Sequence, residues 1–87
     1  MNSKKSQQHL LKQTSQRLKR LRKNKQLSQK SVAARCEMDF GSYTNIENGK
    51  RNITLFTLQK ILIALNISFK EFFNFNLKDF NFFLKPS

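Results

Sequence analysis

The sequence predicts an all-α protein, a five-helix bundle with a Phe-rich C-terminal extension. Three observations support this fold class. Apolar residues recur at helical spacing along most of the chain, and residues that cap helices precede these runs. The segments between the runs are short, which favours one bundle. With 87 residues, the chain has room for one hydrophobic core.

The charge of the chain limits its partners. It has 17 Lys and Arg residues against 5 Asp and Glu, a formal net charge of +12. All nine charged residues among the first 25 are basic, and Glu37 is the first acid. A polyanion is the natural partner, so nucleic acid and anionic membrane surfaces are the two candidates. No apolar run has the length of a membrane span and no signal peptide opens the chain, so we expect a soluble intracellular protein.

The chemistry-bearing residues argue against an enzyme. One Cys and one His exclude an internal disulfide and any recognisable metal site. Cys36 falls on the apolar face of a helix and is expected to be a small core residue. Without a nucleophile-base pair or a phosphate-cradling loop, we expect no catalysis and no cofactor.

The first helix is predicted over Ser15–Asn24, because Leu18 and Leu21 continue an apolar spacing that begins upstream. It is expected to extend back as far as Gln8. Residues 1–6 are expected to be disordered.

The stretch from Leu27 to Arg51 predicts two short helices joined by a tight turn. Ser28 is expected to cap the first of them, and Asp39 to cap the second, Phe40–Asn48. Gly49 supplies the left-handed residue that ends it. The apolar and small residues lie where two crossing helices must touch: Val32, Ala33, Cys36, Met38, Tyr43 and Ile46.

Two more helices follow. Thr54 is expected to cap the fourth, which ends at Asn66. Ser68 and Glu71 form a capping box that opens a short fifth helix. The fourth helix carries a core-facing stripe at positions i, i+3, i+4 and i+7: Leu58, Ile61, Leu62 and Leu65.

The segment Arg17–Phe73 resembles the Cro and lambda-repressor type of DNA-binding domain, the Xre family. The family has Gly at the positions of Gln26 and Glu37, and Glu37 in a positive-φ conformation would cost roughly 1 kcal/mol or more. The matching residues are Leu18, Leu21, Arg22, Leu27, Ser28, Gln29, Ala33, Ile46, Glu47, Asn48, Gly49, Lys50, Arg51, Leu55, Leu58 and Leu65.

The resemblance implies a lambda-repressor-like bundle in which residues 14–75 form a helix-turn-helix DNA-binding domain. Residues 1–13 are then a basic N-terminal arm or helix extension, and residues 76–87 a C-terminal tail for dimerisation. The resemblance also implies that Arg22 and Glu47 pair and tie the first helix to the end of the third.

A recognition helix fits the DNA major groove, about 12 Å wide, and presents its N-terminal residues to the bases. Here those residues are Phe40, Gly41, Thr44 and Asn45. Asn45 suits adenine, while Phe40 and the Thr44 methyl suit a thymine methyl, so an A·T-rich half-site is expected. Phe40 packing down on the preceding helix is the alternative. Phosphate contacts are expected from Ser28, Gln29, Lys30, Lys50, Arg51 and Asn52.

Aromatic residues crowd the C-terminal part, where seven of the nine Phe lie from Phe69 onward. So small a core cannot hide them all, and we expect them to form a homodimer interface. The alternative is a tail that folds back over its own bundle. The expected interface residues are Phe56, Ile63, Phe72, Phe73, Phe75, Phe80 and Phe83.

These expectations define a transcription regulator, a repressor that binds an inverted repeat of double-stranded DNA as a dimer. It would be cytoplasmic and associated with the nucleoid, with no role at a membrane. Two alternatives share the fold: an antitoxin with a toxin as protein partner, or a controller protein of a restriction-modification system. A third is a charge-driven binder of RNA or membrane surfaces.

Overall fold

The computed structural model describes residues 3–74, and this part of the chain is helical without strands. The all-α class and the five-helix bundle are confirmed. The tail 76–87, together with the expected interface residues Phe75, Phe80 and Phe83, lies outside the described residues. The elements are α1 (Ser3–Asn24), α2 (Gln29–Arg35), α3 (Phe40–Glu47), α4 (Leu55–Leu65) and α5 (Phe69–Phe72).

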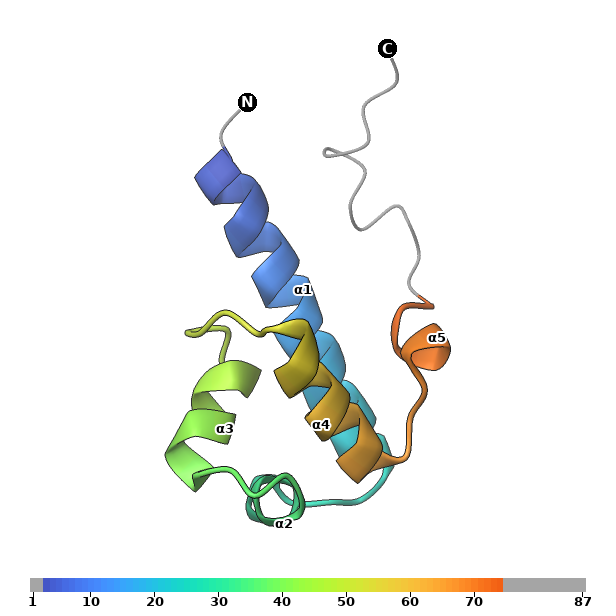
Figure 1. Cartoon of the computed structure of the whole chain (residues 1–87). Coiled ribbons are helices and arrows are strands. Elements are labelled where there is room, and N and C mark those ends of the chain that lie inside the picture. The colour runs from blue at the N-terminus through green and yellow to red at the C-terminus, as the bar shows by residue number, and fades with distance from the viewer. Residues whose placement is uncertain (1–2, 75–87) are drawn as a thin grey trace.

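Helix α1 is the axis of the molecule, and the shorter helices pack around its C-terminal half (Figure 1). Helix α2 contacts both α3 and α4, α3 also contacts α1, and α5 contacts α4. The N-terminal turns of α1 rise beyond the other helices in Figure 1. The helix-turn-helix pair therefore lies against the part of α1 that the sequence identified as helical.

One hydrophobic core joins all five helices. Each helix contributes the apolar side of its 3.6-residue period, which removes these side chains from water. Ala33 keeps the α2 crossing close because it has no branched side chain there. Cys36 is buried as expected. The core consists of Leu18, Val32, Ala33, Cys36, Tyr43, Ile46, Leu58, Ile61, Leu62, Leu65, Ile67 and Phe72.

Three of the four predicted N-caps form their hydrogen bonds. Ser28, Thr54 and Ser68 each accept a hydrogen bond from the backbone N–H three residues on. The prediction for Asp39 is wrong, because its side chain makes no capping bond. Its backbone explains this: the working caps have ψ of 159° to 160°, whereas Asp39 has ψ 141° and φ −59°.

The start of the first helix also differs from the prediction. Helix α1 begins at Ser3, so the expected disorder over residues 1–6 is wrong for residues 3–6. The upstream sequence is rich in Lys, Gln and Leu, which are good helix formers, and contains no Gly or Pro to stop the helix. Of the two forms expected for residues 1–13, the structure has the helix extension from residue 3 onward.

Four helices end in the same way, with a residue of positive φ: Gln26 (59°), Glu37 (54°), Gly49 (70°) and Asn66 (58°). These are Schellman ends, in which the following amide bonds a carbonyl five residues back. The bonds are Leu27 to Arg22 (3.2 Å), Met38 to Ala33 (2.9 Å), Lys50 to Asn45 (3.0 Å) and Ile67 to Leu62 (2.9 Å). Gln26 and Glu37 thus occupy backbone positions that suit glycine.

Replacing Glu37 with Gly is expected to stabilise the fold by about 0.5–1 kcal/mol. Glycine relieves a left-handed strain of roughly 1–2 kcal/mol but adds about 0.5–1 kcal/mol of entropy to the unfolded chain. Urea unfolding at one fixed protein concentration measures the difference. The control is Ala34→Gly at an exposed position inside α2, which should destabilise by about 1 kcal/mol. A Glu37→Gly protein less stable than wild type would contradict the strain.

Candidate nucleic-acid interface

Helix α3 has two unlike faces. Tyr43, Ile46 and Glu47 are buried against the bundle. Phe40, Gly41 and Asn45 are exposed and Thr44 is partly exposed, so the four expected base-reading residues share the outer face. This arrangement follows from the helical period, because residues four apart in sequence lie on one side. The structure therefore brings the expected reading residues together on an accessible surface.

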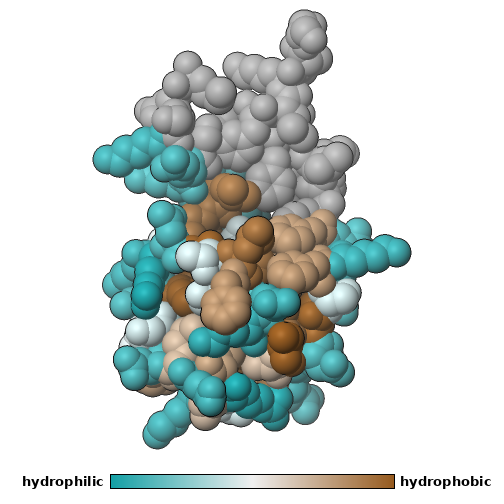
Figure 2. All heavy atoms as spheres, viewed as in Figure 1, coloured by the Kyte–Doolittle hydropathy of each residue, from teal (hydrophilic) through white to brown (hydrophobic). Residues whose placement is uncertain are grey.

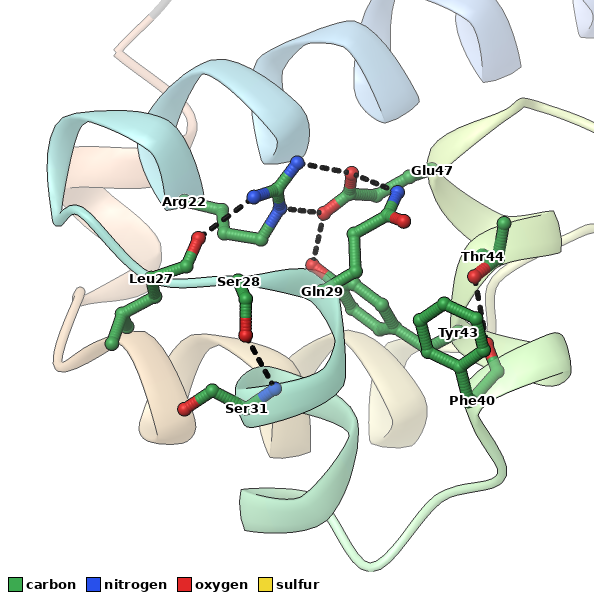
Figure 3. Close-up of polar contacts among 9 residues, drawn as sticks. All are labelled: Arg22, Leu27, Ser28, Gln29, Ser31, Phe40, Tyr43, Thr44 and Glu47. Carbon is green, nitrogen blue, oxygen red and sulfur yellow. Dashed lines mark hydrogen bonds and ion pairs between the residues drawn. The ribbon is translucent and has the colours of Figure 1, made fainter.

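Three of these residues have properties that bear on contact with a base. Phe40 is 51% exposed, so about half of its surface stays accessible and is not packed against α2. The Thr44 hydroxyl donates to the Phe40 carbonyl at 2.8 Å, which leaves its methyl group as the free contact (Figure 3). A Cβ added at Gly41 would meet nothing within 4 Å, so folding does not require glycine there.

Beneath this face lies a buried ion pair. Arg22 donates from Nε to Glu47 Oε2 at 2.7 Å and from Nη2 to Oε1 at 3.1 Å. The same guanidinium donates from Nη1 to the Leu27 carbonyl at 2.7 Å. Gln29 donates to Glu47 Oε1 at 3.0 Å, and the Tyr43 hydroxyl donates to Oε2. Figure 3 shows these side chains converging on one carboxylate from α1, α2 and α3.

The network fixes the charge of each member. Burial by itself raises the pKa of Glu47, but hydrogen bonds from Arg22, Tyr43 and Gln29 bring it below its usual value. The hydrogen bonds that Arg22 donates to Glu47 raise the pKa of Arg22. Burial, followed by the bond to Glu47, raises the pKa of Tyr43. Glu47 is therefore ionised at neutral pH, and Tyr43 keeps its proton.

The expected phosphate-binding residues lie in two places. At the start of α2, Ser28 accepts the capping hydrogen bond from Ser31 N at 3.0 Å, and Lys30 is exposed. Gln29 directs its amide nitrogen at Glu47, which uses one of its two N–H groups. After α3, the expected residues Lys50, Arg51 and Asn52 follow one another and are all exposed.

The sequence did not predict two hydrogen-bond donors to Glu47, nor the residue that holds α5 against α1. Tyr43 stands four residues before Glu47, a spacing that places both on one helical face and could have predicted their bond. Gln29 was assigned to phosphate alone. Arg17 donates from Nε to the Phe72 carbonyl at 2.6 Å and from Nη2 to the Glu71 carbonyl at 2.8 Å, which fastens α5 to α1.

The expected dimer-interface residues separate into two groups. The prediction for Phe72 is wrong, because its ring is 0% exposed and forms part of the core beneath Arg17. Phe56 and Ile63 are 68% and 71% exposed on α4, and Phe73 is also exposed. Figure 2 shows apolar side chains gathered on the face where α4 and α5 lie.

Within residues 3–74, no group of His, Cys, Asp or Glu side chains has an arrangement that could hold a metal ion. In the same part of the chain, none of the helices combines the length and apolarity needed to cross a bilayer.

The fold and this surface define a helix-turn-helix DNA-binding protein. The sequence matches the helix-turn-helix family over residues 18–72, and the chain belongs to that family. The resemblance to the Xre type is thereby confirmed, and the chain is a DNA-binding transcription regulator rather than an enzyme.

Three individual proteins are similar to this chain. Control protein C.MunI from a Mycoplasma species is 49% identical over 59 residues, 67% of this chain and 80% of that protein. The restriction-modification controller protein C.AhdI from Aeromonas hydrophila has a similar structure, with TM-score 0.69 and 36% identity over 72% of this chain and 96% of its own. The controller protein C.Esp1396I gives TM-score 0.75 and 30% identity over 82% and 93%.

Removing the Glu47 carboxylate is expected to destabilise the fold. Glu47→Ala should cost on the order of 1–3 kcal/mol, because it leaves the Arg22 charge buried without its partner. Urea unfolding at neutral pH measures the loss, and near-normal stability would reject it.

The pH dependence of the free energy of unfolding is the control for this loss of stability. Because the folded-state pKa of Glu47 is lowered, its contribution is complete above the ordinary Glu pKa of about 4.3 and is lost as pH falls through the folded value. The stability gap between wild type and Glu47→Gln should therefore narrow below about pH 4. A gap independent of pH would mean that packing, and not charge, is responsible.

Proposed function

We propose that this chain is the controller protein of a restriction-modification system, which regulates transcription by binding an inverted-repeat operator as a dimer. The likeness to C.MunI, C.AhdI and C.Esp1396I supports this assignment over the stand-alone repressor that the sequence favoured and over an antitoxin. The observation that carries DNA binding is the outer face of α3, where unburied side chains are supported from behind by the buried pair.

In the proposed complex, α3 enters the major groove. Asn45 offers an amide that can bond an adenine through two hydrogen bonds, and the Thr44 methyl can contact a thymine methyl. Gly41 lets the helix backbone approach the groove, since the fold leaves open space where a side chain would stand. The first turn of α2 and the segment Lys50–Asn52 then face the phosphates on either side.

A dimer supplies the specificity that one helix lacks. Two recognition helices about 34 Å apart read half-sites on successive turns of one groove. The proposed interface is the exposed apolar patch on α4 and α5, in which the rings of Phe69 and Phe73 stack with centroids 6.1 Å apart. The patch consists of Leu55, Phe56, Ile63, Phe69 and Phe73.

Selection from a random duplex pool tests the function directly. We expect an inverted repeat with A·T-rich half-sites. Asn45→Ala should weaken binding to the selected duplex about 10- to 100-fold, because one bidentate base contact is worth about 1–3 kcal/mol. Asn74→Ala, at an exposed amide outside the α3 face, serves as the control and should bind normally. Equal affinity of both variants for that duplex would remove Asn45 from base reading.

Introducing charge into the apolar patch tests the dimer. The double variant Phe56→Glu/Ile63→Glu should sediment as a monomer at micromolar concentration, because it places four carboxylates in a two-fold interface. Leu10→Glu, at an exposed apolar residue of α1, should leave the dimer intact. A wild-type protein that sediments as a monomer without DNA would contradict the interface.

A further inference from the structure

A groove runs between α1 and the end of α3. Its volume is about 440 Å³. From α1 it is lined by Lys12 and Lys19 among other residues, and from the far side by Asn48 and Gly49. None of these residues belongs to the base-reading or phosphate-binding set derived above, so the groove is a separate feature of the molecule.

The groove carries uncompensated positive charge. Lys12 and Lys19 are both exposed. Of the described residues that line it, Glu47 is the one acid, and the ion pair with Arg22 already neutralises its carboxylate. The carboxylate in the groove therefore pairs with Arg22 and not with the two exposed lysines, whose positive charge favours the binding of an anion.

Close packing holds the stretch of α1 between these two lysines against the turn that ends α3. Ser15, between them in sequence, lies so near the turn that a Cβ on Gly49 would sit 3.1 Å from its hydroxyl oxygen. Glycine at this position thus serves both the positive φ and the approach of α1. As a result, Lys12 and Lys19 stand about one helical turn on either side of a fixed contact point.

The contact point leads directly into the proposed phosphate-binding segment. Gly49 is followed by Lys50, Arg51 and Asn52. Farther up α1, a second depression lies between Gln7, Leu10 and Thr14 on one side and Asn52 and Ile53 on the other. Asn52, the last residue of this segment, thus lies close to α1.

We propose that α1 is a second backbone-binding element, in which Lys12 and Lys19 bind phosphates of the same duplex whose bases α3 reads. This proposal rests on the DNA-binding function proposed above. It gives the part of α1 that carries Lys12 and Lys19 a role in the strength of DNA binding and none in the choice of sequence, because phosphate contacts carry no base information.

Single substitutions with a charge-matched neighbour test the proposal. Lys12→Gln and Lys19→Gln are compared with Arg20→Gln, which removes one charge from an exposed residue of α1 that does not line the groove. Each protein is titrated into the selected duplex and into a scrambled duplex over a range of salt concentrations. Glutamine is a good helix former, and circular dichroism verifies that α1 is retained.

Both lysine variants should bind the two duplexes about three- to tenfold more weakly, and equally so. The slope of log affinity against log salt concentration should fall by about 0.9 for each phosphate that the variant no longer neutralises. Arg20→Gln should change neither quantity by as much. If the lysine variants match Arg20→Gln in affinity and salt dependence, α1 has no role in phosphate binding. The proposed function as a DNA-binding regulator would still stand. A wild type that binds neither duplex would instead overturn the regulator, and this role with it.

Discussion

The ion pair between Arg22 and Glu47 is the constraint on which the DNA-binding surface depends. It connects the end of α1 to the end of α3, and through Leu27 and Gln29 it also holds the start of α2. A buried pair gains little net stability over apolar packing, but its loss on one side leaves a charge that nothing neutralises. Its effect is therefore to permit one arrangement of the three helices and to penalise the others.

That arrangement determines what α3 presents to solvent. Tyr43 and Glu47 are four residues apart, so their hydrogen bond and the pair behind it fix the rotation of α3 about its axis. Once the inner face is fixed, the positions of Phe40, Thr44 and Asn45 on the outer face follow from the helical period. A polar network inside the bundle thus orients side chains that lie outside it.

The parts of the structure that the sequence predicted are those decided within a few residues. The caps at Ser28, Thr54 and Ser68 need a hydroxyl and a free amide three residues away, and both are visible in the sequence. The carboxylate of Asp39 could accept the same hydrogen bond but makes none, because its backbone differs by about 20° from that of the working caps, a difference that the sequence does not show.

Phe72 and Phe73 show what a local sequence pattern does not predict, namely which of two neighbouring rings is buried. Phe72 is the last residue of the one-turn helix α5 and Phe73 is its C-cap, and the sequence gives no reason to treat the two rings differently. The anchoring of α5 by Arg17 turns Phe72 into the core and leaves Phe73 outside. That choice requires a contact across 55 residues of sequence, which no local pattern encodes.

The exposed positive charges affect both the stability of the fold and the binding of a polyanion. Like charges four residues apart on α1, such as Lys19 and Lys23, destabilise an isolated helix by about 0.2–0.5 kcal/mol per pair. Exposed cations of this kind raise the free energy of the folded protein in the absence of a partner. A polyanion that binds the folded form and neutralises them removes the repulsion, and by mass action it stabilises the fold. The charges that weaken the free protein are therefore the ones that favour its complex, and selection for DNA binding can retain them at some expense of stability.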